Sequence, residues 1–141
     1  MSGKRKVLLA LIILTLCFIW GQSLVPGEAS SQESGAVLER VAPILEVIFG
    51  KGNVTDHLVR KLAHVIEYAM LGIEFTLLFN GQDKWVRTVI CHCFLTGFLD
   101  ETIQLFNGRG SFVSDVWLDA SGSALGMAIV LAVIALKRKK E

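Results

Sequence analysis

Charged side chains occur in this sequence where the chain is otherwise apolar enough to cross a membrane. The segment 99–126 holds the polar residues Asp100, Glu101, Gln104, Arg109, Asp115 and Asp119. A charge near the centre of a membrane helix costs about 2.5–3.5 kcal/mol on insertion scales, so such residues pair with one another or serve a function. This segment therefore predicts a polar site built into a membrane protein.

A second group of polar residues lies in the segment 58–79. Arg60, His64 and Glu67 are spaced three or four residues apart, which places them along one side of a helix. Lys61 and Tyr68 flank His64 at offsets of three and four residues and share a face with it. The polarity of this segment therefore falls mostly on one side.

These residue types suit three kinds of chemistry. Guanidinium and ammonium groups bind phosphate or carboxylate. A histidine such as His64, oriented by Glu67 or Asp100, can act as a general base, and an arginine can stabilise phosphoryl charge. The oxygens of Glu101, Asp115 and Asp119 suit Mg²⁺ or Mn²⁺ better than zinc.

Composition indicates one membrane-embedded domain over residues 1–141. The chain is 52% hydrophobic and 19% charged, against about 45–50% and 25% in soluble domains. The three cysteines lie in apolar runs and form neither a disulfide framework nor a zinc-binding spacing. No basic face interleaved with aromatic residues suggests nucleic acid as a partner.

Hydropathy predicts an all-α membrane protein, with a four-helix transmembrane bundle and an extra amphipathic interfacial helix on the outer side. The predicted spans cover residues 7–25, 58–79, 85–106 and 113–136, and the amphipathic helix covers about 35–50. The serine-rich stretch 26–35 is typical of a loop. Pro43 is expected to kink or divide the amphipathic helix. Gly122 and Gly126 have the spacing that lets two membrane helices approach closely.

The first span is typical either of a signal peptide or of a membrane anchor. Further spans downstream favour an anchor that is not cleaved. Four spans put both termini on one side of the membrane. Nine of the fourteen basic residues fall on that side and five on the other. By the excess of basic residues in cytoplasmic loops, both termini are predicted to be cytoplasmic.

The same topology brings the polar residues to one level. At 1.5 Å per residue, Asp100 and Asp119 each lie about 9 Å from the outer ends of their spans, and Glu67 somewhat over 10 Å from its own. Short loops make consecutive spans antiparallel neighbours. The predicted outward-opening pocket comprises Arg60, Lys61, His64, Glu67, Tyr68, Asp100, Glu101, Gln104, Arg109, Asp115 and Asp119. Arg109 is expected to reach one of the acids bidentately. The alternative to a binding pocket is a buried ion-pair network that fixes helix register.

The chain resembles the VanZ-like family of small bacterial membrane proteins, named for a protein associated with resistance to the glycopeptide teicoplanin. The resemblance rests on Ser30-Ser31-Gln32, Lys61-Leu62-Ala63-His64 with Glu67-Tyr68, Asp100-Glu101-x-x-Gln104, Arg109 after a glycine turn, and Asp115…Asp119-x-x-Gly122. Many members carry a histidine where this chain has Ile103. The resemblance implies the bacterial cell membrane, a cell-envelope role and an effect on teicoplanin susceptibility, but no reaction.

Three functional hypotheses follow. The favoured one is a membrane protein whose outer pocket binds a lipid headgroup or a lipid-linked cell-wall precursor. The alternative is an intramembrane metal-dependent hydrolase or transferase acting on a lipid-linked phosphate. A proton- or ion-linked transporter would need a homo-oligomer, because one chain is small. The favoured hypothesis assigns no catalytic residue, cofactor or metal ligand. Its expected partners are membrane lipids or a lipid-linked envelope component, and a homo-oligomer is a further possible partner.

Overall fold

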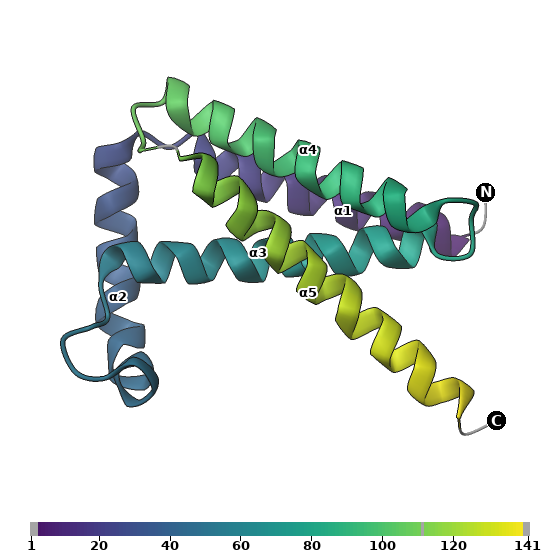
Figure 1. The fold of residues 1–141 in the computed structure, drawn as a ribbon. Helices are drawn as coiled ribbons and strands as arrows, with labels where there is room; N and C mark the ends of the chain where they lie inside the picture. Colours follow the sequence, from purple (N-terminus) through teal and green to yellow (C-terminus); the bar gives the residue numbers. More distant parts are fainter. Residues whose placement is uncertain (1–2, 111, 140–141) are drawn as a thin grey trace.

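The computed structural model describes residues 3–110 and 112–139 and consists of helices joined by short connections (Figure 1). The helices are α1 (Gly3–Ser23), α2 (Gly27–Phe49), α3 (Asp56–Phe79), α4 (Trp85–Phe106) and α5 (Val113–Arg138). Four of them, α1, α3, α4 and α5, are long and apolar enough to cross a membrane. The predicted all-α bundle with one additional helix is confirmed.

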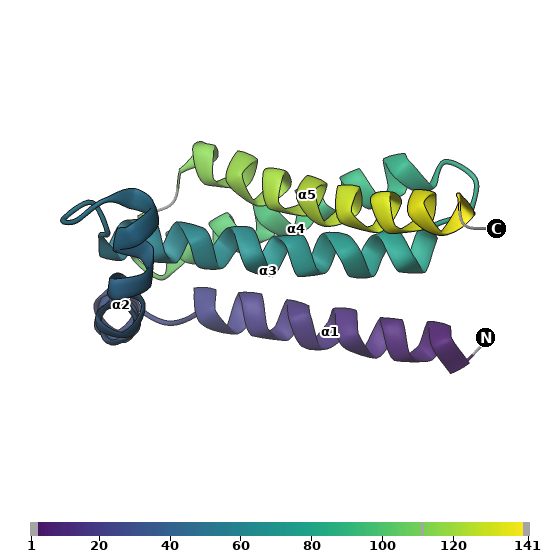
Figure 2. The same ribbon diagram turned by 90° about the horizontal axis from the view of Figure 1, so that it is seen from below.

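Helix α2 lies across one end of the bundle, and both termini lie at the opposite end (Figures 1 and 2). We call these the site end and the terminal end. The site end gathers the α1–α2 connection, the start of α3, the end of α4 and the start of α5. The two views also show that α5 crosses α3 obliquely and diverges from α4 toward the terminal end.

The prediction of a loop over residues 26–35 is wrong, because α2 already begins at Gly27. Pro26 precedes the helix with φ −56°, and its carbonyl accepts the backbone N–H of Ser30. Ser34 donates its hydroxyl to the carbonyl of Ser30 at 2.8 Å, so polar side chains that favour loops are satisfied here within the helix. The helix also continues through Pro43 and is not divided there.

The α3–α5 contact depends on residues without bulky side chains. A Cβ atom added to Gly122 would lie 2.7 Å from the carbonyl oxygen of Val65. A Cβ atom on Gly126 would overlap the backbone of Ala69, and one on Gly72 would overlap that of Ser123. The backbones of the two helices are therefore in direct contact, as the small residues in the fourth span predicted.

The bundle is apolar on the outside and polar inside at its site end. Large apolar side chains such as Leu14, Ile66 and Phe98 are more than half exposed, which suits a lipid-facing surface. Asp100 and Asp119, by contrast, are fully buried. This distribution matches a membrane bundle in which ionisable groups face the interior.

Candidate functional site

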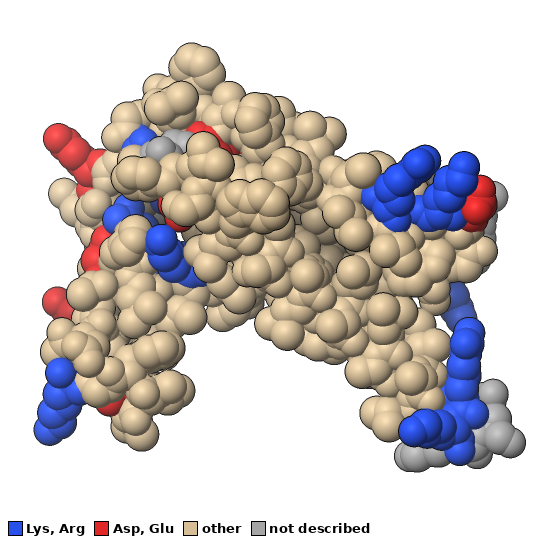
Figure 3. All heavy atoms as spheres, in the orientation of Figure 1, with Lys and Arg blue, Asp and Glu red and all other residues tan. Residues whose placement is uncertain are grey.

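Charged side chains collect at the two ends of the molecule and leave an apolar middle (Figure 3). The visible face of the terminal end is dominated by lysine and arginine, whereas the site end mixes both signs of charge. All eleven residues of the predicted pocket lie on α3, α4, the α4–α5 turn or α5. The structure therefore brings the sequence-predicted residues to one end of the bundle.

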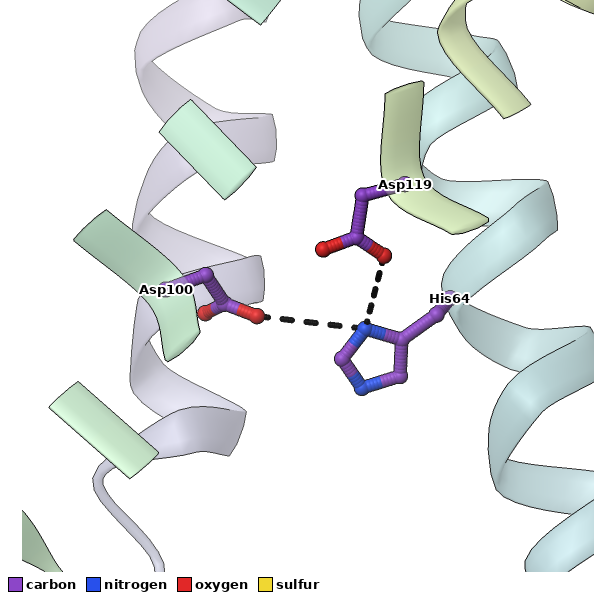
Figure 4. A group of neighbouring side chains, drawn as sticks. All are labelled: His64, Asp100 and Asp119. Carbon is purple, nitrogen blue, oxygen red and sulfur yellow. Dashed lines mark hydrogen bonds and ion pairs between the residues drawn. The ribbon is translucent and has the colours of Figure 1, made fainter. Parts of the chain in front are cut away.

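At the centre of this end, His64 of α3 lies between carboxylates from two other helices (Figure 4). Its Nδ1 atom is 3.3 Å from Oδ1 of Asp119 and 3.8 Å from Oδ2 of Asp100. Both aspartates have no exposed surface. Among the described residues, this is the group of histidine, cysteine and acidic side chains whose ligand atoms lie close enough to hold one metal ion.

Asp100 is held by donors from two helices. The hydroxyl of Ser23, the last residue of α1, donates to Oδ1 at 2.5 Å, and the Gln104 amide donates to Oδ2 at 2.9 Å. The spacing of Asp100 and Gln104 already placed them on one face. Sequence reasoning missed Ser23, whose only signal was a hydroxyl close to the end of the first apolar run.

Glu101 shares the Gln104 amide with Asp100 and also contacts the residue that precedes α5. It accepts the backbone N–H of Phe112 at 3.2 Å and the amide of Gln104 at 3.5 Å. Glu101 therefore connects the last turn of α4 to the residue that precedes α5. Its carboxylate is not part of the group around His64.

Two further ion pairs lie nearer the surface. Lys61 contacts Asp115 at 3.2 Å across α3 and α5, and Arg60 contacts Asp56 at 3.3 Å within α3. Because Asp115 is engaged by Lys61, it lies outside the His64 group. The ligand set of the alternative metal-dependent enzyme, Glu101, Asp115 and Asp119, is therefore not assembled in the part of the chain that the structure describes.

Among the contacts of the described residues, Arg109 has a backbone carbonyl as its partner and not the bidentate carboxylate that we expected. Its Nη1 atom donates to the backbone carbonyl of Gln22 at 2.7 Å, which ties the α4–α5 turn to the end of α1. Burial and the neighbouring Arg60 guanidinium lower the pKa of Arg109, while Asp100 and Glu101 act in the opposite direction. The Nε atom of Arg109 is buried without a hydrogen-bond partner among the described residues.

Two adjoining hollows open beside these groups. One, of about 130 Å³, is lined by Lys61, Gln104 and Asp115, and the other, of about 190 Å³, by Ser23 and Glu67. Arg60, His64 and Arg109 line both. The site is therefore accessible from the site end, and its shared wall carries basic side chains.

Tyr68 lies deeper, beside His64. The two rings are stacked, with centroids 6.4 Å apart and an interplanar angle of 9°. Tyr68 is fully buried, and its hydroxyl has no hydrogen-bond partner among the described residues. It therefore closes the inner side of the site and does not line either hollow.

Comparison with known proteins agrees with this architecture. The family model described as VanZ/LLP1 matches residues 8–135. The chain is similar to a protein of Bacillus subtilis (strain 168) described as the uncharacterized membrane protein YwnJ, with 29% identity over 101 residues that cover 72% of this chain and 68% of that protein. No solved structure gives a significant match.

Proposed function

The chain belongs to the VanZ/LLP1 family, and we propose that it is a membrane protein that binds the anionic headgroup of a lipid or a lipid-linked cell-wall precursor at its site end. The binding position is the wall shared by the two hollows, where Arg60 and Arg109 meet. In the proposed orientation both termini are cytoplasmic, so the hollows open on the outer face of a bacterial cell membrane.

The observation that carries this proposal is the pair of guanidinium groups. The Nε atoms of Arg60 and Arg109 are both buried and have no hydrogen-bond partner among the described residues. Buried N–H groups without an acceptor are costly, and two like charges repel each other. An anionic oxygen between them would satisfy both groups, since guanidinium groups bind phosphate and carboxylate in this way.

The surroundings suit a ligand that has both a polar head and an apolar tail. Phe112 lines the first hollow and is 60% exposed, and the nearby Val113 is 79% exposed. Acyl chains can lie against such a surface while the headgroup enters the hollow. The ion pair between Lys61 and Asp115 forms part of the same wall and holds its lysine close to the bound anion.

Mass spectrometry of lipids that copurify with the protein tests this proposal. The wild-type protein should carry an anionic lipid, and Arg109→Ala should lose it because one of the two guanidinium groups is gone. Arg87→Ala is the matched control, because Arg87 is exposed at the terminal end of α4. If wild type and Arg109→Ala carry the same lipids, binding through Arg109 is wrong.

A cellular consequence follows from the family. We propose that expression of this protein changes bacterial susceptibility to teicoplanin through the same site. Growth inhibition should differ between cells with and without the wild-type protein, and alanine variants at Glu67, Glu101 and Arg109 should abolish that difference. Equal susceptibility of cells with and without the wild-type protein would remove this part of the proposal.

A further inference from the structure

We propose that His64, Asp100 and Asp119 form a binding site for a divalent transition-metal ion, with Zn²⁺ as the best match. The three side chains come from α3, α4 and α5 and point toward one another (Figure 4). This inference goes beyond anion binding by the arginines and does not depend on it.

The spacing of the ligand atoms is close to what coordination of one ion requires. Zinc bonds of about 2.0–2.1 Å at tetrahedral angles separate ligand atoms by about 3.3–3.4 Å. Nδ1 of His64 lies 3.3 Å and 3.8 Å from the two carboxylates. The contact with Asp119 is a long hydrogen bond, since charge-assisted N–H···O bonds are about 2.7–2.9 Å long, and a single N–H cannot point at both oxygens.

The charge balance of the site end also favours a cation. On the parts of α3, α4, the α4–α5 turn and α5 that form this end, the described lysines and arginines are Arg60, Lys61 and Arg109, and the acids are Asp56, Glu67, Asp100, Glu101, Asp115 and Asp119. Arg60 and Lys61 pair with Asp56 and Asp115. The ion-pair contact made by the fully buried Asp100 and Asp119 is with one imidazole. Buried carboxylates are costly unless they are paired and hydrogen-bonded, and a divalent cation would add counter-charge beside both of them.

Two buried polar atoms without a hydrogen-bond partner are a second observation that favours a bound metal ion. Oδ2 of Asp119 and the hydroxyl of Tyr68 both lack a hydrogen-bond partner among the described residues, and neither residue is exposed. The two side chains are neighbours, because a Cβ atom on Gly97 would lie 3.4 Å from Asp119 Oδ2 and 3.7 Å from Tyr68 Cε1. The Tyr68 hydroxyl lies close enough to act on the Asp119 carboxylate, and a bound metal ion, or a water molecule attached to it, would give Oδ2 of Asp119 a further partner.

The surroundings of the three side chains have the other features of a metal site. Ser23 and Gln104 hydrogen-bond to Asp100 and hold it in place, as outer partners of metal-ligating carboxylates do. His64 lines both hollows, so its imidazole connects the two buried carboxylates to the space from which an ion would enter and toward which one coordination position would stay open. One imidazole nitrogen with carboxylates favours zinc, whereas Mg²⁺ and Ca²⁺ prefer oxygen ligands alone.

The test is zinc binding by the full chain, purified in detergent and stripped of metal with a chelator. Cys17, Cys91 and Cys93 are replaced by alanine in every sample, because free thiols also bind zinc. Bound Zn²⁺ is measured by calorimetry and by elemental analysis after desalting. We expect one ion per chain, and Asp119→Asn should weaken binding more than about tenfold, since even outer-shell changes cost that much.

The matched control is Glu39→Gln, which removes an exposed carboxylate on α2 that lines neither hollow. It should leave zinc affinity unchanged. Equal weakening by Glu39→Gln and Asp119→Asn would overturn the proposal, because the zinc would then be held by surface acids. The proposal would also be overturned if the folded chain with His64, Asp100 and Asp119 intact bound no Zn²⁺. That result does not depend on whether the variants fold. Lipid content and zinc content are separate measurements, so this proposal and the anion-binding proposal fail independently.

Discussion

At the scale of single residues, the site depends on how one buried carboxylate is held. Asp100 accepts from Ser23 at 2.5 Å and from Gln104 at 2.9 Å, and these donors come from different helices. A carboxylate without exposed surface needs such donors, because it has lost its contacts with water. Ser23 therefore contributes to the site although it lies 77 residues from Asp100 along the chain.

Ser23→Ala should lower the free energy of unfolding by about 1–3 kcal/mol, because it leaves one oxygen of a buried carboxylate without its donor. Thermal unfolding in detergent would measure this. Ser121→Ala is the control, since Ser121 is exposed and donates only to the Leu118 carbonyl of its own helix. Equal stability of Ser23→Ala and the control would mean that the Ser23–Asp100 contact contributes nothing.

At the scale of helices, the position of Asp119 depends on how closely α5 approaches α3. Gly122 and Gly126 sit against the backbone of α3 at Val65 and Ala69. Asp119 lies one turn before Gly122, so the same close approach brings its carboxylate to His64 of α3. The glycines at this contact therefore position the buried centre of the site.

Gly126→Ala should destabilise the bundle by about 1–3 kcal/mol, the usual cost of overpacking, because the added methyl group meets the Ala69 carbonyl. Gly21→Ala provides the control, as no atom of the described residues lies within 4 Å of a Cβ atom at that position of α1. Unfolding midpoints of the two variants in one detergent give the comparison. A Gly126→Ala midpoint at or above that of Gly21→Ala would show that α3 and α5 have room to separate.

The position of helix α2 bears on how the whole molecule lies in the membrane. The helix covers the site end, and Gly27 at its start lies against Gly108 and Arg109 of the α4–α5 turn. Its apolar residues Ile44, Val47 and Ile48 are 69%, 86% and 71% exposed. A helix that lies across the bundle axis with such an apolar face suits the membrane interface.

At the scale of the whole molecule, the two ends differ in charge. Lysines and arginines at the terminal ends of α1 and α5 form no ion pair with an acid among the described residues, whereas Arg60 and Lys61 at the site end pair with carboxylates. The basic residues at the terminal end act as topology signals, whereas those at the site end belong to the site. We therefore expect the terminal end to face the cytoplasm.

Reporter fusions test this orientation. A reporter that is active only in the cytoplasm should be active when fused after Glu141, because the basic terminal end stays inside. The same reporter inserted at Gly52, in the α2–α3 connection, should be inactive. The reverse pair of results would place the site on the cytoplasmic side.

Much of this protein was determined by its sequence alone. The third and fourth spans were predicted to begin at Trp85 and Val113, where the helices α4 and α5 do begin. Helical spacing also placed Asp100 and Gln104 on one face, where they hydrogen-bond. In hydrocarbon every backbone polar group must be satisfied within its own segment, so a long apolar run has to be a helix whatever surrounds it.

Only the tertiary structure decided which polar groups meet. The choice of Asp100 and Asp119 as neighbours of His64, the contribution of Ser23 and the carbonyl partner of Arg109 all depend on how each helix is rotated about its axis. The tertiary structure also shows that α2 starts at Gly27, where this glycine lies against Gly108 of the α4–α5 turn. Rotation and contact are set by side-chain packing between distant segments, and periodicity within one segment carries no information about its neighbour's rotation.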